Sequence, residues 1–299
     1  MNEVRSASSA GGPDGKTIAL TAAALVCFAL NSLLCRAALG ARLIDATSFT
    51  SLRLMSGAAV LMFLASRKGA WLSGVPNVPL RERALQAASL FFYALPFSLA
   101  YLRLSAGTGA FVVFGCVQIT MIGSGLIAGQ SLRWREGLGL ALALGGLFWL
   151  TRPGAESPDP VGVLLMAIAG VAWGTYSLRG RRTGPPLTST ARNFAATVPL
   201  TLIASAFAIG DVHFTARGAG FALASGAITS GLGYVAWYAA LPSLSATRAS
   251  ILQLAVPPLA SAFGVIFLGE TPSPRMLTAA PLILGGIAIA VAGPKHRAT

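Results

Sequence analysis

Ten stretches of apolar sequence divide this chain from end to end, and each is long enough to cross a lipid bilayer. A helix needs about 20 predominantly apolar residues to span the hydrocarbon core. The predicted spans cover residues 17–38, 46–66, 84–103, 107–129, 134–151, 160–179, 188–209, 217–240, 244–269 and 275–293. Because these spans fill the chain, we expect an all-α polytopic membrane protein with no soluble catalytic domain.

The charged residues favour a lipid partner over a nucleic-acid partner. Only 10% of the 299 residues are charged, whereas soluble domains carry about 25%. The formal net charge is +13, but the basic residues stand singly or in small groups such as Arg67-Lys68 and Arg181-Arg182. A nucleic-acid interface would gather them on one face or stripe. We therefore expect the lipid bilayer as a partner and no nucleic acid.

The basic residues also predict the orientation of the chain. Lys and Arg are enriched in cytoplasmic loops, and most of them here fall on the same side as the N-terminus. We expect a multi-pass protein of the bacterial inner membrane with both termini in the cytoplasm. Residues 1–16 are interpreted as a disordered cytoplasmic tail, and residues 295–299 as a second cytoplasmic tail.

The two halves of the chain repeat. A shift of 140 residues aligns Gly129-Gln130 with Gly269-Glu270, and it aligns residues 144–146 with residues 284–286 (both Leu-Gly-Gly). This places the first repeat at 17–152 and the second at 153–294. An odd number of helices in each half means that the second half inserts upside down. Inverted repeats are typical of transporters, whose site lies near mid-membrane where the halves meet.

These motifs resemble the EamA repeat of the drug/metabolite transporter superfamily. The second repeat carries Gly-Glu-Thr-Pro-Ser at 269–273, whereas in the first repeat Gln130 replaces the usual Glu and Leu132 replaces Pro. The overall character is most similar to the YddG-type aromatic amino-acid exporters. The resemblance implies ten helices, with the first four of each half lining a central cavity and the fifth and tenth at the periphery.

Acidic residues and histidines are missing from the predicted membrane interior, since all of them map to tails, loops or helix ends. Small multidrug transporters, distant relatives of the resembled fold, exchange protons through a glutamate in the first helix. This first helix offers Asn31 and Ser32 instead. We therefore predict facilitated diffusion without proton coupling. The same census leaves no cluster for an intramembrane enzyme, a metal site or a cofactor.

Aromatic side chains lie at helical spacing deep inside several spans. They are Tyr93, Phe97 and Tyr101 in the third, Trp173 and Tyr176 in the sixth, and Tyr234 and Trp237 in the eighth. One interpretation places such residues in the aromatic belts at the membrane surface. Their depth favours a second one, in which they line a cavity, because a buried Tyr hydroxyl or Trp N–H needs a hydrogen-bond partner.

Three amides, Asn31, Gln118 and Gln253, are predicted in mid-helix, where lipid offers no hydrogen-bond partner. They either join helices to one another or, with Ser32, contact the polar groups of a substrate. An aromatic cavity with a few neutral polar groups suits a zwitterion with an apolar side chain. It suits a phosphorylated sugar poorly.

Prolines and two arginines complete the candidate residues. Pro96, Pro257 and Pro258 are expected to kink or loosen their helices, which makes them candidate gating positions, with structural bending without gating as the alternative. Arg53 and Arg192 occupy equivalent places in the two repeats, one to two turns from the start of their helices. We expect them to reach the membrane interface and play a structural role, with binding of a substrate carboxylate as the alternative.

Together these features predict an exporter of amino acids with aromatic or other apolar side chains, such as Phe, Trp, Tyr and Met. Transport would proceed by alternating access through the central cavity, and a monomer is compatible with this mechanism. The alternative is export of another small metabolite or a drug-like compound. A passive channel and an intramembrane enzyme fit the sequence least.

Overall fold

The computed structural model describes residues 15–67, 78–129, 134–152, 157–180, 185–244, 249 and 252–291. Within these ranges the first half forms α1 (Gly15–Gly40), α2 (Ala46–Arg67), α3 (Leu80–Tyr101), α4 (Ala106–Ile127) and α5 (Trp134–Thr151). The second half forms α6 (Pro160–Gly180), α7 (Pro186–Phe207), α8 (Ala216–Ala224), η2 (Ser225–Leu232), α9 (Gly233–Ala240), η4 (Gln253–Ala255), α11 (Val256–Leu268) and α12 (Pro274–Val291). Short 3-10 turns, η1 (Ile209–Asp211) and η3 (Leu241–Ser243), follow α7 and α9.

The predicted all-α membrane fold is confirmed. Across the described residues, α8, η2 and α9 join into one rod, and η4 continues into α11, so that ten helical rods are present. Six rods are long and apolar enough by themselves to cross a bilayer, including the one that runs from Ala216 to Ser243. The predicted tails at 1–16 and 295–299 lie almost entirely or entirely outside the described residues.

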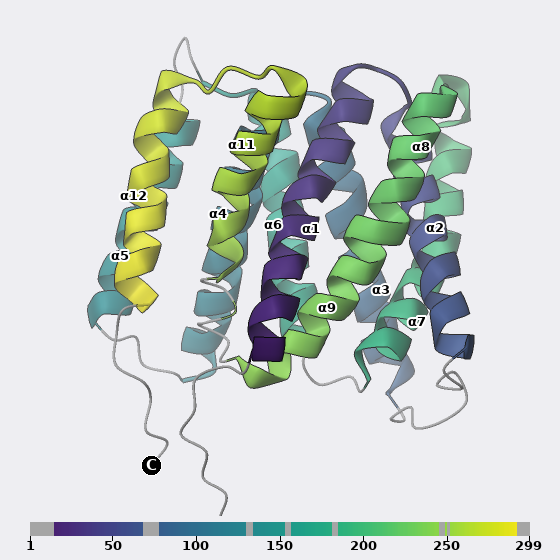
Figure 1. Cartoon of the computed structure of the whole chain (residues 1–299), viewed down its shortest axis with the longest axis horizontal. Helices are drawn as coiled ribbons and strands as arrows, with labels where there is room; N and C mark the ends of the chain where they lie inside the picture. The colour runs from purple at the N-terminus through teal and green to yellow at the C-terminus, as the bar shows by residue number, and fades with distance from the viewer. Residues whose placement is uncertain are drawn as a thin grey trace, which may run out of the picture.

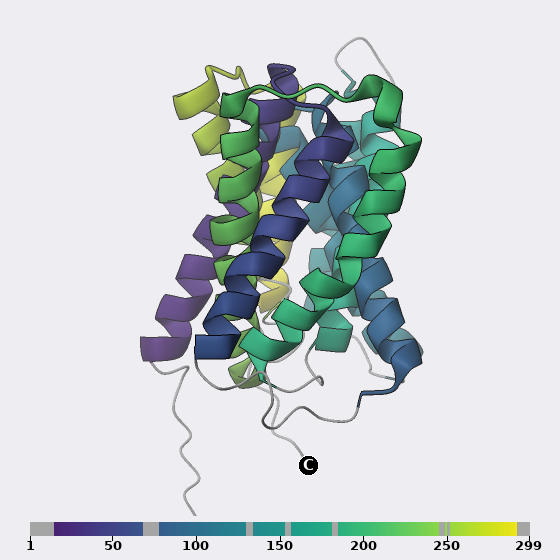
Figure 2. The ribbon, with the colours of Figure 1, turned by 90° about the vertical axis from the view of Figure 1, so that its right-hand side faces the viewer.

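The rods stand side by side, and the start of α1 lies at the same end of the molecule as the end of α12 (Figure 1). We call this the inner end and the opposite one the outer end. The α5–α12 pair forms one edge, which is the peripheral place that the resemblance implies. At the opposite edge, α2 packs between α7 and the α8–η2–α9 rod (Figure 2).

Contacts between the two halves pair up under the predicted repeat. The α2–α7 and α5–α12 contacts each join two equivalent helices. The α3–α6 contact has its counterpart in α1–α9, and the α4–α6 contact has its counterpart in α1–α11. Since α1 and α6 begin at opposite ends of the molecule, the second half is inverted relative to the first. The α1, α3, α6 and α9 segments therefore meet at the centre.

Polar side chains are buried inside the bundle, whereas large apolar side chains are exposed around it. Large apolar side chains such as Phe63, Phe148 and Phe207 are exposed on the outside, where lipid would cover them. Buried polar groups, among them Asn31 and Gln118, lie inside instead. This pattern suits a bilayer because a polar group facing lipid has no hydrogen-bond partner, whereas the bundle interior can supply one.

Two helices depart from the regular spans that the sequence predicts. In the ninth, Pro257 and Pro258 lie in the first turn of α11 instead of in mid-helix. A proline lacks the N–H that a continuous helix needs, so the 3-10 turn η4 precedes α11 and the prolines begin it. In the eighth, Ser225–Leu232 form a π-helical segment, for which the hydrophobic pattern carries no signal.

Candidate functional site

An aromatic cage occupies the centre of the bundle and draws its rings from both halves. Its members are Phe28 on α1, Tyr93 and Phe97 on α3, Trp173 and Tyr176 on α6, and Tyr234 and Trp237 on α9. The Trp173 ring lies 4.6 Å from the Tyr234 ring and 5.0 Å from the Tyr93 ring between centroids. The Phe28 ring meets the Trp173 ring edge to face at 5.5 Å. These separations are those of favourable aromatic contacts.

A small cavity adjoins the cage, with about 10 Å³ of room. Its lining consists of Phe28, Ser32, Tyr93, Phe97, Val113, Phe114 and Trp173. This volume holds about one water molecule, whereas small-molecule sites measure roughly 300–1,000 Å³. The conformation is therefore closed around the cage, and an organic ligand could enter only after rings or helices move.

Arg53 lies beside the cage, and its side chain is fully buried at 0% exposure. This corrects the expectation that it reaches the membrane interface. Its Nε donates to Ser230 Oγ at 2.9 Å, and its Nη2 donates to the hydroxyls of Tyr93 and Tyr234 at 3.3 and 3.2 Å. The guanidinium carbon lies 5.3 Å from the ring centroids of both Tyr93 and Phe97. The remaining nitrogen, Nη1, is buried without a hydrogen-bond partner among the residues that the structure describes.

The guanidinium of Arg53 also lacks a carboxylate. Three ion pairs occur among the described residues, and none of them includes Arg53. An arginine stays protonated in proteins, and a buried charge is normally paired. The centre of the bundle therefore holds an uncompensated positive charge surrounded by aromatic rings and hydroxyl groups.

Asn31 organises the polar side of this centre. Its Oδ1 accepts hydrogen bonds from Ser225 at 2.7 Å, Thr229 at 3.2 Å and Ser230 at 3.3 Å, and its Nδ2 donates to Tyr93 at 3.4 Å. The three hydroxyls all come from η2, so the π-helical turn brings them to one acceptor. In this conformation Asn31 therefore joins α1 to α3 and η2 by hydrogen bonds, which is one of the two roles considered for it from the sequence.

The π-helical segment sits close against α2 because of a glycine. A Cβ added at Gly226 would overlap the backbone oxygen of Arg53 and the hydroxyl of Ser56. Only glycine permits this approach, which brings Ser230 within hydrogen-bond distance of Arg53. π-Helical segments occur frequently at functional sites.

The other predicted amides and aromatics are also buried. Trp173 Nε1 donates to Gln253 Oε1 at 2.8 Å, which ties α6 to η4. Tyr176 accepts a hydrogen bond from Asn193 at 3.2 Å. Gln118 is buried in α4, and Arg192 is half-buried in α7. Trp237 Nε1 is buried without a partner among the described residues.

The structure thus gathers most of the predicted site residues. Tyr101 is the exception, because its hydroxyl donates to Ala106 O near the outer end of α3 even though its ring contacts Phe97. Pro96 is buried within α3. Sequence reasoning did not select Ser225, Thr229 and Ser230, since small hydroxyl residues are common in membrane helices and only the π-helical geometry brings these three together.

Similarity to known proteins identifies the family. Residues 160–292 match the EamA-like transporter family. A Pseudomonas aeruginosa protein, named only as uncharacterized, is 46% identical over 96% of this chain and 98% of its own length. The chain belongs to the EamA-like transporter family. The predicted superfamily is therefore correct.

Two more distant proteins are also similar to this chain, one in sequence and one in structure. A Streptantibioticus cattleyicolor protein named a probable terminal-alkyne amino-acid exporter is 23% identical over 67% of this chain and 69% of its own length. A solved structure titled "Crystal structure of protein" superposes with a TM-score of 0.70, covering 94% of this chain and 99% of that chain at 21% identity. The second similarity concerns the fold alone.

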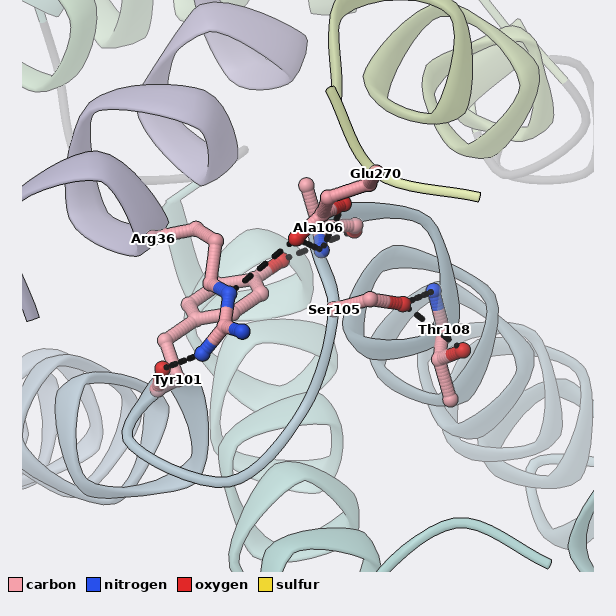
Figure 3. Close-up of polar contacts among 6 residues, drawn as sticks. All are labelled: Arg36, Tyr101, Ser105, Ala106, Thr108 and Glu270. Atoms are coloured by element: carbon pink, nitrogen blue, oxygen red, sulfur yellow. Dashed lines mark hydrogen bonds and ion pairs between the residues drawn. The ribbon is translucent and has the colours of Figure 1, made fainter. Parts of the chain in front are cut away.

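In this EamA-like transporter, the Gly-Glu-Thr-Pro-Ser segment fastens the outer end of the bundle (Figure 3). Gly269 ends α11 with a positive φ of 65°. Glu270 then accepts hydrogen bonds from the Ala106 backbone N–H at 2.9 and 3.2 Å and from Arg36 Nε at 3.1 Å. Arg36 also donates to Tyr101 O at 3.0 Å. The carboxylate lies at the N-terminus of α4, where the helix dipole favours negative charge, and it links the end of α11 to α1 and α4.

Two further ion pairs join α3 to α6, one at each end. Arg103 contacts Asp159 at 3.2 Å at the outer end, and Arg179 contacts Glu82 at 2.6 Å at the inner end. A hydrogen bond from the Gly162 backbone and the charge of Arg103 lower the pKa of Asp159 below its usual value. The α3–α6 pair therefore has a charged link at both surfaces of the membrane.

The Asp45 carboxylate stabilises the loop that precedes α2 at the outer end. Burial opposes its ionisation, but hydrogen bonds from Thr47, Ser48 and His213 outweigh burial and hold the pKa of its carboxyl below the usual value. The bond to the His213 backbone connects this loop to the one before α8. Within the described residues, His, Cys, Asp and Glu side chains form no group of three that could hold a metal ion.

Proposed function

We propose that this protein exports amino acids with aromatic or other apolar side chains across the bacterial inner membrane. The aromatic cage at the meeting point of the two halves is the observation that carries this proposal. Its rings offer a broad apolar surface, and its hydroxyl and amide groups supply the few polar contacts that fix a small ligand's orientation. The name of the Streptantibioticus relative, which refers to amino-acid export, supports the same substrate class.

The proposed mechanism is alternating access around the cage. The cage takes rings from α1 and α3 of one half and from α6 and α9 of the other. A rocking motion of one half against the other would therefore open it to either side in turn. The closed cavity fits an intermediate of this cycle. The change from the 3-10 turn η4 to the α-helix α11, beside Pro257 and Pro258, is a candidate hinge.

We further propose that transport runs down the substrate gradient without protons, with both termini in the cytoplasm. The carboxylates described above lie in loops and at helix ends: Asp45 caps α2, Glu270 caps α4, and Glu82 and Asp159 pair with arginines. Each is therefore held by a structural partner away from the cage. The inner end, where α1 begins and α12 ends, would face the cytoplasm.

Counterflow into proteoliposomes tests the proposal. Purified protein is reconstituted with a high internal concentration of one unlabelled amino acid, and entry of labelled phenylalanine is followed. We expect transient accumulation with internal Phe, Trp, Tyr or Met and little with internal Asp or Lys. Entry no faster than in protein-free vesicles across the whole panel would refute the amino-acid assignment. A sustained dependence of accumulation on an imposed pH gradient would refute uncoupled transport.

Export of another small metabolite or drug-like compound is the second candidate. The aromatic cage would accept a flat organic molecule as readily as an apolar amino acid. The positive charge of Arg53 beside the cage opposes organic cations, which disfavours quaternary amines within this class. A panel of neutral and acidic flat organic compounds that are not amino acids, used in the same counterflow assay, separates the two candidates.

A further inference from the structure

Arg53 brings a charged group to the central site, and the aromatic cage does not explain its chemistry. A guanidinium has five N–H donors in a planar fork that matches a carboxylate. Three hydrogen bonds occupy Nε and Nη2, and all three acceptors are neutral hydroxyls. Nη1 is completely buried and has no partner in the described part of the chain. The side chain therefore retains an unused donor edge and an unpaired charge.

A purely structural role accounts poorly for this arrangement. A neutral side chain could join α2 to Tyr93, Tyr234 and Ser230 without bringing a charge into the membrane interior. Ionisable residues inside a membrane are expensive, and they usually mark a substrate path. Leaving a buried charge unpaired costs more than pairing it. The missing partner is an anion, and the described carboxylates are held elsewhere.

The place of Arg53 connects it to the cavity. The rings of Tyr93 and Phe97 line the cavity, and each also lies 5.3 Å from the guanidinium carbon. A displacement of either ring would therefore expose the donor edge to a ligand in the cage. The remaining cage rings, led by Trp173, would then surround the apolar part of the same ligand.

We infer that Arg53 binds the carboxylate of the transported substrate, and that this carboxylate, rather than the amino group, is the polar feature the site selects. The inference rests on the proposed function and narrows its substrate class. An ammonium group finds aromatic faces here, which attract cations only modestly, and it is repelled by Arg53. The site therefore prefers an apolar carboxylate whether or not that ligand carries an amino group.

A competition panel on the wild-type protein tests the selection directly. Labelled phenylalanine counterflow is measured against phenylalanine, 3-phenylpropionate, phenylalaninamide and phenethylamine, which share one ring but differ in their charged groups. We expect 3-phenylpropionate to compete at least as well as phenylalanine. The two ligands without a carboxylate should need at least about tenfold higher concentrations. Equal competition by phenethylamine or phenylalaninamide would overturn the inference.

Substitution of Arg53 separates binding from structural support. In Arg53→Met the half-inhibitory concentration of 3-phenylpropionate should rise on the order of 10- to 100-fold, as expected for loss of a charged hydrogen-bond partner. That of phenethylamine should stay constant or fall. A structural defect would instead weaken all competitors together, and that outcome would overturn the inference. Arg192→Met, at the equivalent position of the second repeat, is the control and should keep the wild-type order.

Arg53→Lys keeps the charge without the planar fork and replaces Arg53→Met if that variant does not fold. It should preserve the order of competitors with weaker carboxylate binding, whereas an inverted order would contradict the inference. If phenylalanine counterflow fails in the wild type, the proposed function falls. The carboxylate site is then judged by thermal stabilisation with 3-phenylpropionate against phenethylamine, and no difference between them refutes it.

Discussion

Gly170 on α6 offers the sharpest test of how closely the central helices must approach. A Cβ added there would lie 2.5 Å from the backbone oxygen of Val113 on α4 and 2.6 Å from Cys116 Cβ. A backbone oxygen cannot rotate away as a side chain can. Gly123→Ala, on α4, is the matched control because no atom lies within 4 Å of its added Cβ.

The expected effect follows from these distances. A carbon and a carbonyl oxygen approach to about 3.3 Å, so Gly170→Ala must move α6 from α4 by roughly 0.8 Å. Overpacking of this kind costs about 1–3 kcal/mol. The same shift displaces Trp173, which donates the 2.8 Å hydrogen bond to Gln253. Cavity-lining Val113 and Trp173 would separate with it.

Thermal unfolding of the two purified variants in the same detergent and at the same heating rate measures this cost. At about 2–4 °C per kcal/mol, Gly170→Ala should lower Tm by roughly 2–12 °C. Gly123→Ala should not lower Tm and should raise it by up to about 4 °C, since Gly→Ala within a helix stabilises by up to about 1 kcal/mol. Phenylalanine counterflow should slow only in Gly170→Ala. Equal Tm values for the two variants would refute the packing argument.

Three other predictions concern the outer end and the periphery. Glu270→Gln keeps an acceptor for Ala106 but loses the charge that meets Arg36 and the α4 dipole, so Tm should fall by an amount matching about 1–2 kcal/mol; an unchanged Tm would contradict this. The folded pKa of Asp45 is lowered, so its stabilisation is complete above its ordinary pKa of 3.8 and is lost as the pH falls through the folded value. Asp45→Asn should therefore have a lower Tm than wild type at pH 7, and the difference in Tm should vanish in strong acid. A difference in Tm that persists in strong acid would argue against stabilisation by the ionised Asp45 carboxylate. Gly286→Ala should destabilise the α5–α12 pair, because its Cβ would lie 2.5 Å from Gly139 O. Neighbouring Gly285→Ala should not, because no atom lies within 4 Å of its added Cβ. Both variants should retain the wild-type order of competitors if the α5–α12 pair is peripheral to the site.

The architecture was predictable because membrane helices obey a simple rule. Ten apolar stretches and an offset repeat suffice to specify ten rods and an inverted second half, since lipid leaves the backbone no alternative to helices. The aromatic residues were identifiable for a related reason, because Trp173 and Tyr234 lie too deep in their spans to reach a membrane surface. Both predictions rest on the depth of each residue within its span and on the pattern of apolar residues along the chain.

Details that depend on side-chain direction and local helix geometry were not predictable. Distance from the helix start suggested that Arg53 reaches the interface, yet its side chain points inward to Ser230, Tyr93 and Tyr234. Only tertiary contacts set that direction. The π-helical turn at Ser225–Leu232 likewise depends on the close approach of Gly226 to α2, which a single sequence does not encode as a pattern.

The charged links between α3 and α6 have a consequence for the energy of the transport cycle. Two identical inverted repeats would make the inward-open and outward-open states mirror each other and have equal free energies. Arg103–Asp159 and Arg179–Glu82 break that equivalence, because the described residues of α1 and α9, the corresponding pair, are joined by no such link. In the proposed alternating-access cycle, this asymmetry would give the empty carrier a preferred orientation.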